Sequence, residues 1–124
     1  MELVMSDEFS TPGRKFDLAA KDKRWLAMDY FYKATNDLEA YKPEAVSTRA
    51  CIPSAGENCE TRGLMSIKMS HELVNVSYAP ESWGPDPSYN KEYKSGAING
   101  WNKFCFTGGY VEARVKMPRG DGLW

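Results

Sequence analysis

Hydrophobic and polar residues alternate most cleanly near the end of the chain, over residues 110–117. The apolar members of this stretch are Val111, Ala113, Val115 and Met117, and the members between them are Tyr110, Glu112, Arg114 and Lys116. A period of two is typical of a β-strand with one buried face. Residues 97–106 predict a second strand, and the glycines of Thr107-Gly108-Gly109 can supply the positive φ of a tight turn. The pattern therefore predicts a β-hairpin over residues 97–117, with charges pairing across its wet face.

Shorter alternating stretches predict more strands upstream. They cover residues 2–9, 45–49 and 64–70. In the last of them we expect Leu64, Ile67 and Met69 to point inward. Residues 80–89 hold three prolines and a glycine, which predicts a loop, and residues 21–24 predict a solvated charged run. Because no convincing amphipathic helix appears, the pattern predicts an all-β fold, an antiparallel β-sandwich.

Length and composition narrow the class of protein. The 124 residues are the size of one domain, and four Trp, seven Tyr and five Phe suit both β-sheets and sugar-binding surfaces. A net charge of −1 offers no basic field for a nucleic acid. The sequence shows neither an apolar run of transmembrane length nor a signal peptide. Because predicted strands reach both ends, we expect the chain to be a piece of a longer protein, with targeting segments outside it.

Three cysteines bear on the compartment. Cys51 and Cys59 flank a short loop with turn residues, so they could close a disulfide, which would imply an oxidising compartment. The alternative is three unrelated thiols. Cys105 is left over from such a disulfide, and would be a buried thiol or pair with a cysteine beyond residue 124. The cysteine spacing and the single histidine, His71, argue against a zinc site.

One N-glycosylation sequon is present, Asn75-Val76-Ser77. In a secreted protein this tripeptide can accept a glycan on Asn75. Such tripeptides also occur often by chance, so the sequon alone is a weak signal.

No catalytic constellation can be assembled from these residues. Asp7 and Glu8 are neighbours on a predicted strand, so they would point to opposite faces and could not flank one glycosidic bond. We expect them to cap a turn or face solvent. His71 lies beside Glu72 in a polar stretch and is expected to be exposed. Nothing in the sequence calls for a cofactor.

Two side chains suggest contacts with sugar. Trp101 lies among Gly100, Asn102 and Lys103, an unusually polar setting for a core tryptophan. Sugar rings stack on aromatic faces, so Trp101 is a candidate platform, and its alternative role is in the core or on a sheet surface. The Asn36 amide could donate to and accept from sugar hydroxyls, and its alternative role is a turn residue.

Four motifs occur in order along the chain and together resemble glycoside hydrolase family 16. They are Ser6-Asp7-Glu8-Phe9, residues 35–39, residues 101–110 and Gly122-Leu123-Trp124. The run from Trp101 to Tyr110 is most similar to the β-glucan-synthesis-associated branch of fungal cell-wall proteins. The resemblance implies a jelly roll with a glycan cleft, and retaining cleavage or transfer on β-glucan.

The resemblance also sets limits on what this chain can do. The family's catalytic acids follow the Gly-Leu-Trp-Pro segment, so none is expected within residues 1–124. What carries over is substrate binding by Asn36, Trp101 and Trp124. We expect the chain to be the incomplete N-terminal part of one jelly-roll domain, prone to aggregate through uncovered edges.

The resemblance implies a β-glucan-active glycosidase or transglycosylase-like protein in cell-wall β-glucan synthesis or remodelling. The alternatives are a non-catalytic β-glucan-binding module and a structural wall protein. The expected partner is β-glucan polysaccharide, and the expected location is the secretory pathway, at a membrane or outside the cell. Any membrane association would come from segments outside this chain.

Overall fold

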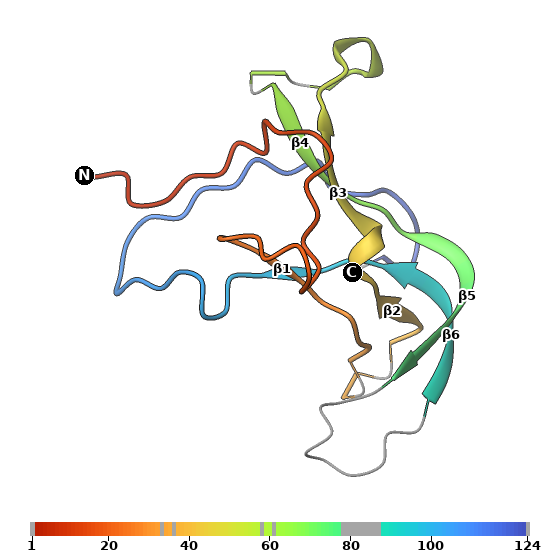
Figure 1. Ribbon diagram of the computed structural model, residues 1–124. Coiled ribbons are helices and arrows are strands. Elements are labelled where there is room, and N and C mark those ends of the chain that lie inside the picture. The colour runs from red at the N-terminus through yellow and green to blue at the C-terminus, as the bar shows by residue number, and fades with distance from the viewer. Residues whose placement is uncertain are drawn as a thin grey trace.

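The described part of the protein is built from β-strands of two to eight residues joined by turns and loops (Figure 1). The computed structural model describes residues 2–32, 34–35, 37–57, 59–60, 62–77 and 88–123. The strands are β1 (Leu26–Ala27), β2 (Glu39–Tyr41), β3 (Val46–Ala50), β4 (Gly63–Ile67), β5 (Ser70–Ser77), β6 (Ser88–Ser95) and β7 (Ile98–Asn99). Within the described residues the helices are two 3-10 turns, η1 (Pro43–Ala45) and η2 (Pro53–Ala55). The prediction of an all-β chain is confirmed.

These strands form three small sheets. β1 pairs with β7 and β3 pairs with β4, both antiparallel. In the third sheet β6 lies between antiparallel β5 and parallel β2, and β5 and β6 make a long curved ribbon in Figure 1. Antiparallel and mixed sheets without α-helix are consistent with part of a β-sandwich. The jelly-roll topology stays a prediction.

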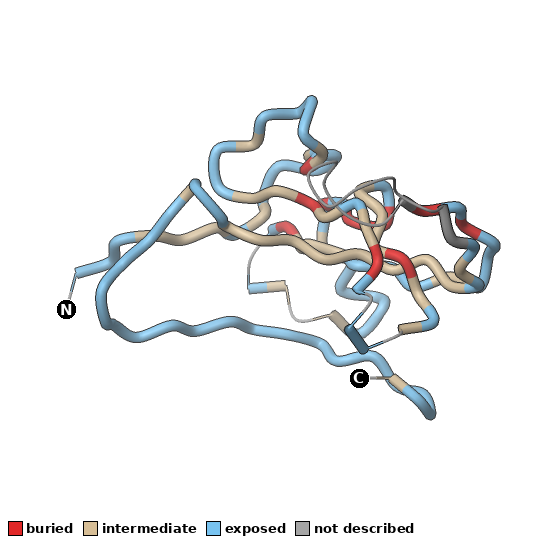
Figure 2. The backbone as a smooth tube through the Cα atoms, turned by 90° about the horizontal axis from the view of Figure 1, so that it is seen from below, coloured by how far each residue is buried: buried red, intermediate tan, exposed pale blue. Residues whose placement is uncertain are grey.

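Two hydrophobic clusters hold the sheets together. One joins Phe31 and Ala40 to the buried valines of β5. The other consists of Phe16, Ala27 and Val46, with Phe9, Trp25, Met65 and Ile98 packed against it. Figure 2 shows the buried positions within this paired part of the chain, and exposed positions along almost all of the C-terminal segment. The second cluster is the one that positions the candidate site.

Gly63 allows the N-terminal segment to lie directly against β4. A Cβ built on Gly63 would lie 2.1 Å from the backbone oxygen of Phe9, closer than any side chain tolerates. The absence of a side chain therefore lets the backbone near Phe9 approach the sheet, and this approach brings the Asp7 region over the second cluster.

The hairpin predicted over residues 97–117 is wrong. β7 ends at Asn99 and pairs with β1, and residues 104–119 contain no regular secondary structure. Side chains from both predicted faces are open to solvent: Tyr110 is 73% exposed and Val115 66%. The Gly108 turn does have positive φ, at 70°. Alternation alone cannot make a strand, because a strand also needs a hydrogen-bonding neighbour and a surface to cover its apolar face.

Other strand predictions have mixed outcomes. The strand at residues 45–49 is confirmed by β3, whereas residues 2–9 have no regular structure and leave Leu3 80% exposed. The strand at 64–70 is confirmed in part by β4, where Leu64 is half-buried, but the prediction that Ile67 and Met69 point inward is wrong. Ile67 and Met69 are nearly half exposed, and Met65 packs against the second cluster because it pairs with buried Thr48.

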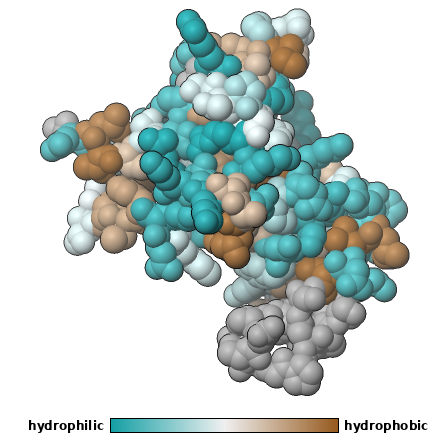
Figure 3. Space-filling model, in the orientation of Figure 1, coloured by the Kyte–Doolittle hydropathy of each residue, from teal (hydrophilic) through white to brown (hydrophobic). Residues whose placement is uncertain are grey.

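Two further predictions concern a loop at residues 80–89 and the lack of a transmembrane segment. Residues 80–87 of the predicted loop lie outside the described residues, and Ser88 and Tyr89 belong to β6 instead. Over the described ranges, no helix is long and apolar enough to span a bilayer. Figure 3 shows a face that is mostly polar, with apolar side chains gathered at several separate places.

Candidate functional site

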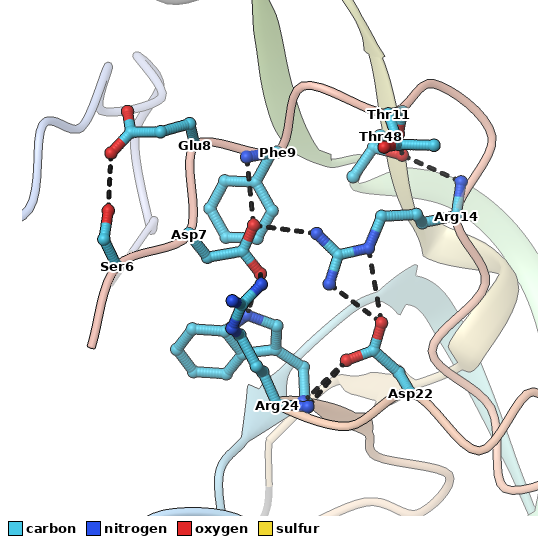
Figure 4. Close-up of polar contacts among 10 residues, drawn as sticks. Ser6, Asp7, Glu8, Phe9, Thr11, Arg14, Asp22, Arg24 and Thr48 are labelled. Atoms are coloured by element: carbon cyan, nitrogen blue, oxygen red, sulfur yellow. Dashed lines mark hydrogen bonds and ion pairs between the residues drawn. The ribbon is translucent and has the colours of Figure 1, made fainter. Parts of the chain in front are cut away.

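Hydrogen bonds join four side chains, Asp7, Arg14, Asp22 and Trp25, into a group that we call the Asp7 cluster (Figure 4). Asp7 Oδ1 accepts hydrogen bonds from Arg14 at 2.8 Å and from the backbone N–H of Phe9 at 3.0 Å. Its Oδ2 accepts the indole N–H of Trp25 at 2.8 Å. The Asp7 side chain is only 5% exposed, so this carboxylate is enclosed and fully engaged.

Arg14 joins the two carboxylates. Its guanidinium also donates to Asp22 Oδ2, at 2.8 and 3.3 Å, and the other oxygen of Asp22 accepts the backbone N–H groups of Arg24 and Trp25. The backbone N–H of Arg14 donates to Thr48 of β3 at 2.8 Å. The cluster therefore ties the N-terminal segment to the loop before β1 and to the β3-β4 sheet.

Burial and hydrogen bonding have opposite effects on the pKa values of Asp7 and Asp22. Burial raises the pKa of Asp7, but hydrogen bonds from Arg14, Phe9 and Trp25 outweigh it, so the pKa lies below the usual value. The same balance, with bonds from Arg14 and two backbone N–H groups, lowers the pKa of Asp22. Both groups are carboxylates at neutral pH, and neither is tuned to act as a general acid.

The cluster bears on two expectations. Asp7 caps a turn through the Phe9 N–H, as expected, but it is enclosed and does not end a strand. Asp22 belongs to a charged run expected to be solvated, yet its side chain is 12% exposed and paired. Glu8 is exposed and accepts the Ser6 hydroxyl, in keeping with the expectation for it. A hollow of about 470 Å³ over the cluster is lined by polar residues, including Ser10, Thr11 and Lys23.

Trp101 lies on a turn beside this cluster. The backbone N–H groups of Lys103 and Phe104 donate to the Gly100 carbonyl, and Asn102 has a left-handed φ of 57°. The Trp101 N–H donates to Asn99 Oδ1 at 3.0 Å, and the indole is 73% exposed. We call residues 100–103 the Trp101 turn. Because Trp101 is open to solvent, the alternative that it is a core residue is wrong.

A single long side chain connects the Trp101 turn with the Asp7 cluster. Lys103 Nζ donates to the backbone carbonyl of Asp22 at 2.6 Å. The same cluster that joins the N-terminal segment to β3 thus also anchors the turn that presents Trp101. The other two predicted sugar-binding residues, Asn36 and Trp124, lie outside the described residues.

The predicted disulfide between Cys51 and Cys59 is confirmed. Cys51 and Cys59 form a disulfide across the loop, with Cα atoms 5.6 Å apart, and Cys105 is a free, exposed thiol rather than a buried one. Glu57 approaches both sulfurs, but disulfide sulfurs are not metal ligands. A hydrogen bond from Arg49, followed by one from the Ile52 N–H, lowers the pKa of Glu57 to about 2. This carboxylate holds the loop rather than a metal.

Three remaining residues can be placed. His71 is exposed on β5, as expected, with its ring 5.0 Å from that of Tyr93. Arg114 forms an ion pair with Glu60 in a distant loop, so the predicted pairing across a hairpin is wrong. Asn75 is exposed on β5 and donates to Asn90 of β6 at 3.2 Å.

Comparison with known proteins gives a consistent set of relatives. The family described as β-glucan synthesis-associated protein SKN1/KRE6/Sbg1 matches residues 1–55. Beta-glucan synthesis-associated protein SKN1 of Saccharomyces cerevisiae is 35% identical over 99% of the chain, and KRE6 of the same yeast is 34% identical over 99%. The chain resembles the β-glucan synthesis-associated proteins. The segment that the family matches contains the whole Asp7 cluster.

These relatives are much longer than the chain, which covers 13% of SKN1 and 14% of KRE6. A glucan endo-1,3-beta-glucosidase A1 from Niallia circulans is 37% identical over 57 residues, which is 46% of the chain and 8% of that enzyme. No solved structure gives a significant match. The similarity to the β-glucan-synthesis-associated branch is confirmed, and glycoside hydrolase family 16 itself stays a prediction.

Proposed function

We propose that the chain is part of a protein that acts in cell-wall β-glucan synthesis or remodelling and contacts β-glucan through Trp101. The observation that carries this proposal is the similarity to β-glucan synthesis-associated proteins over 99% of the chain. Residues 1–124 would form the N-terminal part of a jelly-roll domain of the family-16 type. The disulfide supports a location in the secretory pathway or outside the cell.

The Trp101 turn supplies a fitting surface. Trp101 is 73% exposed, and its backbone N–H donates to Asn99 Oδ1. Hydrogen bonds within the turn hold the backbone on the other side. An aromatic face held in this way can stack on the C–H face of a glucose ring without first paying to order the loop. Asn36 and Trp124 are proposed to extend the contact to neighbouring sugar units.

The finer proposal is that the full-length protein cleaves or transfers β-glucan. The similarity to a glucan endo-1,3-beta-glucosidase over 57 residues supports it, and the family resemblance puts the catalytic acids after Trp124. The second candidate is a β-glucan-binding module without catalysis. The exposed Trp101 supports it, because stacking of an aromatic ring on a sugar requires no catalytic acid.

The test uses the full-length protein and its Trp101→Ala variant. We expect the variant to bind insoluble β-glucan about fivefold more weakly, because it loses one aromatic contact worth about 1 kcal/mol. Tyr110→Ala is a matched control, since Tyr110 and Trp101 are both 73% exposed. Equal retention of all three proteins would refute the Trp101 assignment.

The same preparations distinguish the two candidates. Incubation with β-1,3- and β-1,6-linked glucan oligosaccharides should give shortened or lengthened products if the protein is a glycosidase or transglycosylase. Binding without any new product would favour the binding module. Neither binding nor products would favour a structural wall protein and contradict both proposals.

A further inference from the structure

β5 is an edge strand with two very different faces. In its sheet it pairs only with β6 among the described strands. Val74 and Val76 are 9% and 2% exposed and pack on Phe31 and Ala40. Leu73 and Asn75, which flank Val74, are exposed, and Leu73 is 74% open to solvent. An apolar side chain next to a free strand edge is a surface that folded proteins usually cover.

Asn75 is well placed for attachment of a covering group. Its side-chain nitrogen donates one hydrogen to Asn90 Oδ1 at 3.2 Å, across the strand pair. The amide carries a second hydrogen, and replacing it leaves the bond to Asn90 intact. The core contacts of Val74 and Val76 on either side stay unchanged, since they lie on the opposite face. A large substituent on Asn75 can therefore extend into solvent without disturbing the sheet.

We propose that Asn75 carries an N-linked glycan that covers Leu73 and the free edge of β5. The side-chain nitrogen forms a bond to the anomeric carbon of an oligosaccharide carried on a lipid diphosphate. The bond from that carbon to the diphosphate oxygen breaks, the diphosphate leaves with the electron pair, and the amide gives up one proton. Ser77 completes the acceptor tripeptide, and no other asparagine of the chain is followed by this pattern.

The proposal rests on delivery to an oxidising, glycan-transferring compartment and not on glucan binding. The Cys51–Cys59 disulfide, more than fifteen residues away in sequence, independently indicates such a compartment. The two features agree although neither depends on the other. A result against Trp101 would therefore leave the glycan proposal standing, and the reverse also holds.

Peptide mass spectrometry of the full-length protein, isolated from a yeast host, tests the attachment. We expect the peptide with Asn75 to carry a glycan, and an amidase that releases N-glycans to convert Asn75 to aspartate. Asn75→Gln and Ser77→Ala should each abolish the modification. Ser77→Thr should retain it because threonine also completes the tripeptide. Asn90→Ala is the matched control: it removes the amide that accepts from Asn75 but no glycan acceptor. Recovery of unmodified Asn75 as the main form would overturn the proposal.

The covering role is tested on protein that has already folded. Enzymatic removal of the glycan should increase self-association, measured by sedimentation, because Leu73 and the β5 edge become accessible. Leu73→Ser should reduce this association in the deglycosylated protein. An unchanged sedimentation profile after complete glycan removal would show that the glycan does not cover an associating surface and would overturn that half of the proposal.

Discussion

At the scale of single residues, Asp7 and Glu8 show how neighbouring acids acquire different roles. Glu8 is exposed and accepts a hydrogen bond from the Ser6 hydroxyl, whereas Asp7 is enclosed by Arg14, Trp25 and the Phe9 N–H. An enclosed carboxylate stabilises a fold only when its oxygens are all bonded, because an unpaired buried charge costs several kcal/mol. Both oxygens of Asp7 accept hydrogen bonds, so Asp7 meets this condition. The condition does not apply to Glu8, because its carboxylate is exposed to water.

Replacing Asp7 should therefore weaken the fold, and most strongly at neutral pH. We expect Asp7→Asn to lower the free energy of unfolding by about 2 kcal/mol, because the variant loses charge-assisted bonds and turns an N–H donor toward other donors. The folded pKa of Asp7 lies below 3.8, so its contribution is complete above the unfolded value and is lost as the pH falls below it. The wild type should lose more stability than the variant between about pH 5 and pH 2. Urea unfolding followed by tryptophan fluorescence, repeated at several pH values, measures the free energy of unfolding of the wild type and of the variant.

The control for this prediction is Glu8→Gln, which changes the adjacent charge without touching the cluster. It should leave the urea midpoint nearly unchanged at every pH. Equal losses in the two variants would mean that net charge, and not the bonds of Asp7, accounts for the effect.

The sequence could foresee Trp101 but not the Asp7 cluster. The polar neighbours of Trp101 predict an exposed ring, and the ring is exposed. The other members of the cluster, Arg14, Asp22 and Trp25, lie 7, 15 and 18 positions after Asp7, with no fixed period between them. Only the approach of the backbone to Gly63 and the contact with Thr48 bring them together. A cluster built by tertiary packing leaves no local pattern to read.

At the scale of elements, a strand can be predicted from the sequence when buried apolar and exposed polar residues alternate along it, and not when nearly all its residues are polar. β3 alternates buried Val46 and Thr48 with more exposed residues, and the pattern shows this. β6 consists almost entirely of polar residues, yet it is the central strand of its sheet. Lys91 resolves the contradiction: its ammonium lies 4.4 Å from the centre of the Phe31 ring, so its aliphatic stem serves as core surface. A hydrophobicity pattern cannot register such a stem.

The loop between β3 and β4 depends on its disulfide. Reduction of Cys51–Cys59 should lower the stability of the chain by about 2 to 3 kcal/mol on the chain-entropy estimate for a loop this short. The melting temperature should fall on addition of reductant, and Cys59→Ser should show the reduced value without it. Cys105→Ser is the matched control, because Cys105 is a free thiol and should leave the response to reductant unchanged. A melting temperature insensitive to reductant would show that the bonds from Arg49 and Ile52 to Glu57 hold the loop alone.

At the scale of the whole molecule, stability is distributed unevenly. The region from Phe9 to Asn99 contains the two hydrophobic clusters, the paired strands and the disulfide. The segment after residue 103 is exposed along nearly its whole length, and Arg114 is held by a surface ion pair with Glu60. Surface pairs of this kind contribute at most about 1 kcal/mol. The segment should therefore open far more often than the sheets do.

Limited proteolysis of the 124-residue chain tests this distribution. We expect trypsin to cut first after Arg114 and Lys116, at least about tenfold faster than after Arg49, because Arg49 lies in the paired strand β3. Arg49 is a fair comparison since its side chain is 41% exposed and only its backbone is protected. The order of fragments in mass spectra over time gives the rates. Protection of Arg114 equal to that of Arg49 would mean that residues 110–117 pair as a strand, the arrangement that their alternation predicts. Early cleavage would instead show that a sequence with the period of a strand stays open until another strand is present to pair with it.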